Sequence, residues 1–191
     1  MWAAGRLERW IERFRDLLPA LVQAGQARAN EMSEQELANA FWAIATLRKD
    51  APELQAALPA LTEAVPLQAD SLKAQGVSII FWSVARLRAD APCLHDLIRW
   101  VVGLVLEQAR NMRQQEIAKT AWAAGEMRIR SDDAARMFAV LREEASSKIE
   151  DFKPQEISDL CWGFAACNQT DTKFMTLVAN QIVTDVPHWR S

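Results

Sequence analysis

The chain has 191 residues, of which 50% are hydrophobic and 25% are charged, and its formal net charge is −3. These values are typical of a globular protein and exclude a disordered or fibrous chain. The mild negative charge argues against a protein that bulk positive charge holds on nucleic acid or on a membrane. The longest apolar run, around residues 97–106, contains Arg99 and is too short to cross a bilayer, so we expect no membrane span.

The first residues, Met1 to Arg28, mix arginines such as Arg6 and Arg9 with the acidic residues Glu8 and Glu12. Organellar transit peptides contain few acidic residues, and no apolar segment with a small-residue cleavage site is present. We therefore expect this stretch to be part of the fold, with no targeting segment visible in the chain.

Tryptophans recur every forty residues, and other positions follow the same period. A glutamine lies seven residues before four of these tryptophans, with an aliphatic residue two positions further on. The tryptophans are Trp2, Trp42, Trp82, Trp122 and Trp162, and the glutamines are Gln35, Gln75, Gln115 and Gln155. Such coincidence indicates a tandem repeat. The chain is predicted to be one array of about four and a half units: a partial unit 1–30, then 31–70, 71–110, 111–150 and 151–191.

Each unit is predicted to form two helices. In the first complete unit, apolar residues at helical spacing predict a first helix over Ser33–Lys49, with Ser33 and Glu36 forming a capping box. Pro52 then begins a second helix that extends to about residue 68. Pro19 and Pro59 lie within second helices, where a kink or a break into two pieces is expected. The predicted fold class is all-α, an α-solenoid of tandem forty-residue helical hairpins.

The tryptophans are flanked by small residues one helical turn to either side, which favours a structural role with each indole packed against a neighbouring unit. The alternative is a ladder on which nucleobases stack. The glutamines lie in the first turn of each first helix, and we expect each amide to bond the backbone of the next unit.

Two basic columns also follow the repeat. One lies at the C-terminal end of the first helices, and the other lies at the N-terminal end, two residues before the glutamine. The first contains Arg48, Arg88 and Arg128, and the second contains Lys73, Arg113 and Lys153. Such stripes suit a polyanion backbone. The competing explanation for the arginines is that cations simply complement the helix dipole at C-termini.

The residues that vary between units lie three positions before and four positions after each tryptophan. They include Asn39, Lys119, Asp159, Arg86 and Glu126. Small residues lie between them and are expected to form a flat exposed patch: Ala43, Ser83, Ala123 and Gly163. This layout is expected if each unit contacts one base of a linear ligand, although any unconstrained solvent face has the same appearance.

No catalytic constellation emerges from the sequence. Cys93 and His95 are two residues apart on an expected helix and point in different directions. There is no glycine-rich phosphate loop and no metalloprotease or serine-hydrolase motif. The three cysteines form no CxxC pair, and we expect no enzyme activity, no metal site and no cofactor.

The segments QELANAFWAIATL (35–47), QEIAKTAWAAGEM (115–127) and QEISDLCWGFAAC (155–167) resemble the octotricopeptide-type repeat of algal organelles. They are also similar to units of the FAST-kinase-like and RAP-domain proteins. The resemblance covers essentially the whole chain. It implies an RNA-binding helical-repeat protein that acts in the processing, stability or translation of RNA in a chloroplast (plastid) or mitochondrion.

Two functions are therefore expected. In the first, the chain binds single-stranded RNA, the two basic columns hold phosphates, and the five varying residues named above contact bases. In the second, the chain is a protein-interaction scaffold of the armadillo or TPR kind, which the mildly acidic composition favours. Trp100, Trp189 and Ile79 would then form apolar patches outside the repeat core. No small-molecule substrate is expected in either case.

Overall fold

A computed structural model describes residues 14–185, which consist almost entirely of α-helices and short 3₁₀ segments. Between these residues no strand is present, which confirms the all-α prediction for this part of the chain. Trp2, in the partial unit, and Trp189 lie outside the described residues.

The first helices of the four complete units begin at equivalent positions. They are α3 (Glu34–Leu47), α5 (Ala74–Leu87), α7 (Gln114–Met127) and α9 (Pro154–Ala166). At the start of α3, the Ser33 backbone N–H donates to Glu36 Oε2 at 2.9 Å, and the Glu36 N–H donates to Ser33 Oγ at 3.4 Å. This reciprocal pair is the predicted capping box, and it satisfies backbone donors that have no partner inside the helix.

The second helices are α2 (Leu18–Arg28), α4 (Leu58–Leu67), α6 (Leu94–Gln108), α8 (Asp132–Ser147) and α10 (Thr172–Asp185). The breaks predicted at Pro19 and Pro59 are confirmed. A 3₁₀ segment over Pro52–Ala57 precedes α4, another over Arg15–Leu17 precedes α2, and each proline lies in the first turn of the α-helix that follows. Proline has no N–H to donate, so a new helix begins at each of these points.

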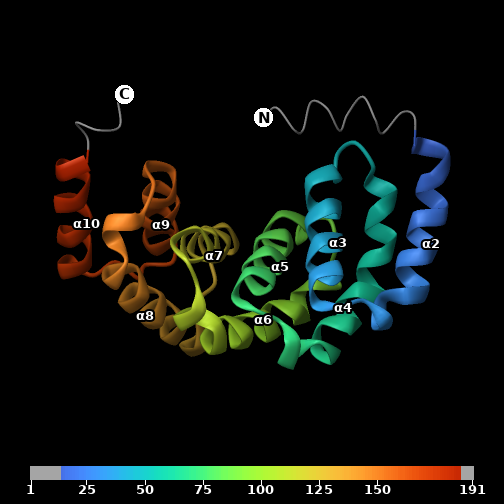
Figure 1. Ribbon diagram of the computed structural model, residues 1–191, viewed down its shortest axis with the longest axis horizontal. Coiled ribbons are helices and arrows are strands. Elements are labelled where there is room, and N and C mark those ends of the chain that lie inside the picture. The colour runs from blue at the N-terminus through green and yellow to red at the C-terminus, as the bar shows by residue number, and fades with distance from the viewer. Residues whose placement is uncertain (1–13, 186–191) are drawn as a thin grey trace.

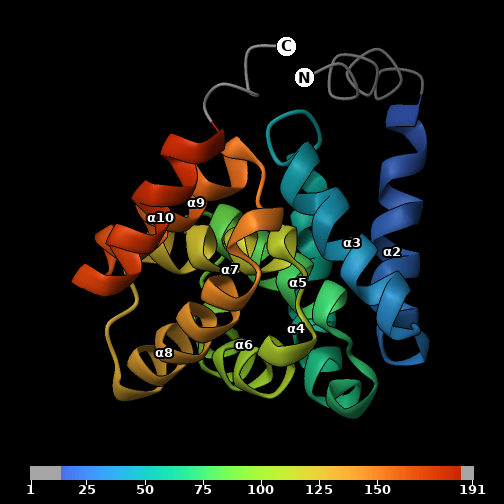
Figure 2. The same cartoon turned by 60° about the vertical axis from the view of Figure 1, so that its left-hand side comes forward.

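The helices form two layers along a curved molecule (Figure 1). Helices α3, α5, α7 and α9 lie on the inner side of the curve, each packed against the next, and α4, α6 and α8 lie on the outer side. Figure 2 shows the same layering from another direction, with α7 between α5 and α9. The contacts between successive first helices are the most extensive among the described helices, so these four helices form one continuous layer.

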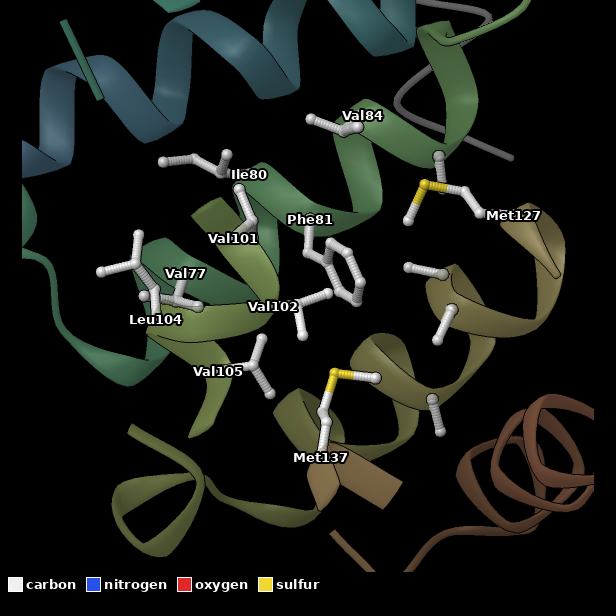
Figure 3. Close-up of a cluster of buried hydrophobic side chains, with 14 of the residues drawn as sticks. Val77, Ile80, Phe81, Val84, Val101, Val102, Leu104, Val105, Met127 and Met137 are labelled. Atoms are coloured by element: carbon white, nitrogen blue, oxygen red, sulfur yellow. The ribbon is translucent and has the colours of Figure 1, made fainter. Parts of the chain in front are cut away.

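The apolar core lies between the two layers. Phe81 on α5 is fully buried, and it lies beside Val102 of α6 with Met127 and Met137 of the next unit close by (Figure 3). Fully buried phenylalanines recur on the first helices as Phe41, Phe81 and Phe164. Because one hydrophobic cluster runs from Ala29 to Val178 through all four complete units, burial of the core depends on neighbouring units.

Small residues allow the inner helices to approach closely. A Cβ built on Gly163 of α9 would overlap the Ala121 carbonyl group of α7, and a Cβ on Gly125 of α7 would lie 2.8 Å from Gly163 Cα. The expectation of an exposed small patch is therefore wrong. Three of these small residues are buried and one is half-buried: Ser83, Ala123 and Gly163, and Ala43. At Gly163 the reason is the close contact of α9 with the preceding helix α7.

Candidate functional site

Each first helix leaves one stripe of side chains facing away from the second helices, on the inner side of the curve. The residues sit at i, i+4, i+7 and i+11 and share a helix face. We call this stripe across the four helices the inner face. It comprises Gln35, Asn39, Trp42 and Thr46 of α3, Gln75, Ile79, Trp82 and Arg86 of α5, Gln115, Lys119, Trp122 and Glu126 of α7, and Gln155, Asp159, Trp162 and Ala166 of α9.

The four repeat tryptophans that the structure describes are only partly buried in the core. Trp42 and Trp162 are each 44% exposed, whereas Trp82 and Trp122 are half-buried against the core cluster. The Trp162 ring packs over Gly125, where an added Cβ would lie 2.7 Å from the ring. The Trp162 indole therefore packs against the neighbouring unit as predicted, and it also contacts the Trp122 ring of that unit. The expectation that the indoles are purely structural is incomplete, because ring surface also remains in solvent on the inner face.

The rings and one arginine form a row along the inner face. Trp122 and Trp162 stack with ring centroids 6.2 Å apart and planes 30° apart. In the preceding unit, the guanidinium carbon of Arg86 lies 5.5 Å from the centre of the Trp82 ring, within the range of a cation–π contact. The i, i+4 spacing of Trp82 and Arg86 is the sequence signal for this pair.

Positive charge gathers beside this row at the C-terminal ends of α3 and α5. Burial lowers the pKa of Arg86, and the nearby charge of Arg48 lowers it further, with Glu126 opposing both. Arginine remains charged in proteins, so these shifts report a partly desolvated cation close to a second one. Arg86 Nε is buried without a hydrogen-bond partner, and Arg88 donates to the Glu126 carbonyl at 2.9 Å. The arrangement suits an anionic group of a ligand, so Arg86, which the sequence predicts to contact a base, is placed as well to contact a phosphate beside Arg48.

The rest of the predicted basic columns lie apart from this cluster. Arg128, an exposed residue at the end of α7, adopts a left-handed backbone conformation with φ of 49°. Lys73, Arg113 and Lys153 are exposed N-cap residues at the opposite ends of the inner helices. The two columns therefore border the inner face on two sides.

The five predicted base-contacting residues all lie on the inner face. Asn39 and Glu126 are exposed, and Lys119, Asp159 and Arg86 are half-buried. Burial lowers the pKa of Lys119, and the neighbouring Glu116 opposes this shift. Burial raises the pKa of Asp159, whose carboxylate accepts a hydrogen bond from Gln155 at 3.0 Å. These groups are placed to contact a ligand along the helices.

The glutamine ladder expected between units is wrong. All four repeat glutamines are exposed. Within the described residues their side chains make one hydrogen bond, from Gln155 Nε2 to Asp159 Oδ1 in the same helix. The glutamines lie on the inner face, turned away from the backbone of the next helix, so their amides remain available to a ligand.

Replacing Asp159 by asparagine is expected to raise stability more at neutral pH than in acid. The pKa of Asp159 is higher in the folded protein than in the unfolded chain. The protein therefore loses stability as the pH rises from the unfolded pKa, about 3.9, through the folded pKa. Asparagine carries no such charge and keeps the oxygen that Gln155 bonds. Urea unfolding at pH 4 and pH 7 measures the difference, and an equal effect at both values would contradict the assignment.

Two hollows lie among the described residues, of which the first includes residues of the inner face and the second does not. One of about 240 Å³ lies at the N-terminal ends of α5, α7 and α9, lined mostly by polar side chains that include Lys119 and Arg113. The other, about 690 Å³, is a groove between α2, α3 and α4 lined by apolar residues such as Leu18, Val22 and Leu61. In residues 14–185, no cluster of His, Cys, Asp or Glu is arranged to hold a metal ion, and no helix is long and apolar enough to cross a membrane.

A comparison with protein-family models finds no match for this chain, and a comparison with curated proteins finds none either.

Proposed function

We propose that the chain is an α-solenoid that binds single-stranded RNA along its inner face. The packing of each first helix against the next supports a solenoid, because each unit contacts mainly its neighbours. The repeat's resemblance to octotricopeptide-type units supports RNA as the ligand and a plastid or mitochondrion as the location. In this proposal the protein acts in the processing, stability or translation of organellar RNA and has no enzyme activity of its own.

The observation that carries the proposal is the row of partly exposed indoles beside a cluster of arginines. Trp42 and Trp162 expose ring surface, and Arg86 lies over Trp82 with its Nε unbonded. Proteins that bind single strands combine aromatic rings, on which bases stack, with cations that follow the phosphates. The formal net charge of −3 does not oppose this, because the cations are concentrated locally around Arg48, Arg86 and Arg88.

At about one base per unit, the four complete units contact about four nucleotides. The direct test is fluorescence anisotropy with a pool of short random single-stranded RNAs, titrated from low to moderate salt. Affinity that falls log-linearly with salt would support the phosphate contacts. Absence of binding at low salt would contradict the proposal.

Replacing Trp42 by alanine is expected to weaken RNA binding by about fivefold or more, because stacking of one base contributes about 1–3 kcal/mol. The matched control is Trp100→Ala. Trp100 is 51% exposed, but it lies on α6 in the outer layer. Anisotropy with the same RNA pool measures both. Equal affinities for the two variants would show that the inner-face indole makes no contact with RNA.

The second candidate function is a protein-interaction scaffold, and the apolar groove of about 690 Å³ favours it. Exposed apolar residues extend from the groove at the same end, among them Leu17 and Leu21. A protein bound there would bury apolar surface, so its affinity would depend little on salt. The salt titration therefore separates the two candidates, since only the RNA proposal predicts a steep salt dependence.

A further inference from the structure

The polar pocket at the N-terminal ends of α5, α7 and α9 is formed by residues of three units. Its volume of about 240 Å³ corresponds to about eight water molecules in the liquid. This is small for a drug-sized ligand and adequate for one flat ring system. Ile79 of α5 provides an apolar wall, and Gln75 and Gln115 border the pocket from the inner face.

The charges that line the pocket cancel. The cations are Arg113, Lys119 and Lys153, and the acidic residues are Asp151, Glu116 and Glu156. A free anion therefore gains little by entering. An uncharged heterocycle that both donates and accepts hydrogen bonds is better matched to this lining, because each of its edges can meet a group of the complementary kind.

The carboxylates are held in place before any ligand arrives. The Arg113 backbone N–H donates to Glu116 Oε2 at 2.8 Å, and the Lys153 N–H donates to Glu156 Oε2 at 2.9 Å. The second carboxylate oxygen of each glutamate takes no part in these bonds. In Glu116 this oxygen, Oε1, lies 3.8 Å from Arg113 Nε, a distance typical of a loose ion pair. These oxygens can accept hydrogen bonds from a ligand without a change in the helix caps.

Lys119 supplies the donor. Its side chain is half-buried beside the pocket, and it makes no hydrogen bond with any residue in the described part of the chain. Burial also lowers its pKa, because water is partly excluded from the ammonium group. The equivalent residues of α5 are Gly76 and Ile79 in place of Glu116 and Lys119, so the preceding unit lacks this combination of donor and acceptor.

We propose that this pocket binds one guanine base of a single-stranded RNA. Lys119 donates to O6 and N7 of the guanine, the pairing that lysine makes most often with bases. Glu116 and Glu156 accept from its N1–H and N2–H₂ groups. Guanine is the base that presents two neighbouring acceptors and two neighbouring donors. The inference rests on the proposed RNA binding and adds to it a position at which base identity is read.

The test uses octamers of uridine that carry a single guanosine, inosine, adenosine or cytidine at a central position, with anisotropy on the full chain. The guanosine octamer is expected to bind at least about fivefold more tightly than the adenosine octamer. Inosine lacks the N2 amine and should lose part of this preference. An unmodified chain that binds all four equally would overturn the pocket assignment while leaving RNA binding intact.

The Lys119→Met variant is expected to bind all octamers within about twofold of one another, whatever its overall affinity for RNA. Lys173→Met, an exposed lysine on α10, is the control and should retain the guanosine preference. A preference that survives Lys119→Met would overturn the proposal. The inosine comparison needs no variant, so the proposal stays testable if Lys119→Met folds poorly. Failure of every octamer to bind at low salt would instead remove the RNA-binding function itself, and the pocket with it.

Discussion

Replacing Gly163 by alanine is expected to destabilise the protein by about 2 kcal/mol or more. The added methyl group would overlap the Ala121 carbonyl group and lie 3.0 Å from Trp122 N. These are backbone atoms, so no change of side-chain rotamer can relieve the overlap. Helix α9 must then move away from α7, which opens the most extensive helix contact in the molecule. Urea unfolding followed by circular dichroism measures the loss.

Gly103→Ala is the matched control for this substitution. Gly103 lies inside α6, and a Cβ built there meets nothing within 4 Å. Alanine stabilises a helix interior relative to glycine, so a gain of about 0.5–1 kcal/mol is expected. Two glycine-to-alanine changes in helices should therefore have opposite signs. A gain at Gly163 would contradict the close packing of the inner layer, and a loss at Gly103 would contradict the open space beside that residue.

Replacing Arg48, Arg86 and Arg88 together by glutamine is expected to abolish most RNA binding at moderate salt. Each phosphate contact contributes about 0.7 to the slope of log affinity against log salt for a single strand, so loss of three should flatten the slope by about 2. Glutamine keeps a donor for the Glu126 carbonyl that Arg88 bonds, which limits the cost to folding. Anisotropy over a salt series gives both affinity and slope.

The control for this variant removes the same charge elsewhere. Arg15, Arg99 and Arg110 are exposed and belong to the second helices or the segments beside them. Their triple glutamine variant is expected to bind RNA with an unchanged slope. If both triple variants lose affinity equally, overall charge governs binding, and the assignment of the phosphates to the inner face is wrong.

Much of the secondary structure follows from local features of the sequence. The forty-residue period places each first helix, Ser33 and Glu36 set the start of α3, and Pro19 and Pro59 set the breaks before α2 and α4. These features were predictable because a helix cap or a proline acts within one or two turns of its own position. The positions of the basic columns at helix ends follow from the same local rules.

The candidate site was predictable only in part. The five varying residues do lie on one face, since side chains at helical spacing share a face in any helix. The exposure of Trp42 and Gln115 was not predictable, because a repeated residue can belong to the core or to the surface equally well. Exposure of the Trp42 ring depends on how closely the adjacent helices pack against it.

The sequence by itself determined the repeat, the helices and the residues that share each helix face. Only the tertiary structure decided which of those faces are covered. Gly125 and Gly163 let α7 and α9 approach until the small-residue side is sealed, which leaves the Trp162 ring lying over the neighbouring unit with one surface in solvent. The polar pocket around Lys119 arises in the same way, because its walls belong to three units whose spacing is set by the side chains between them.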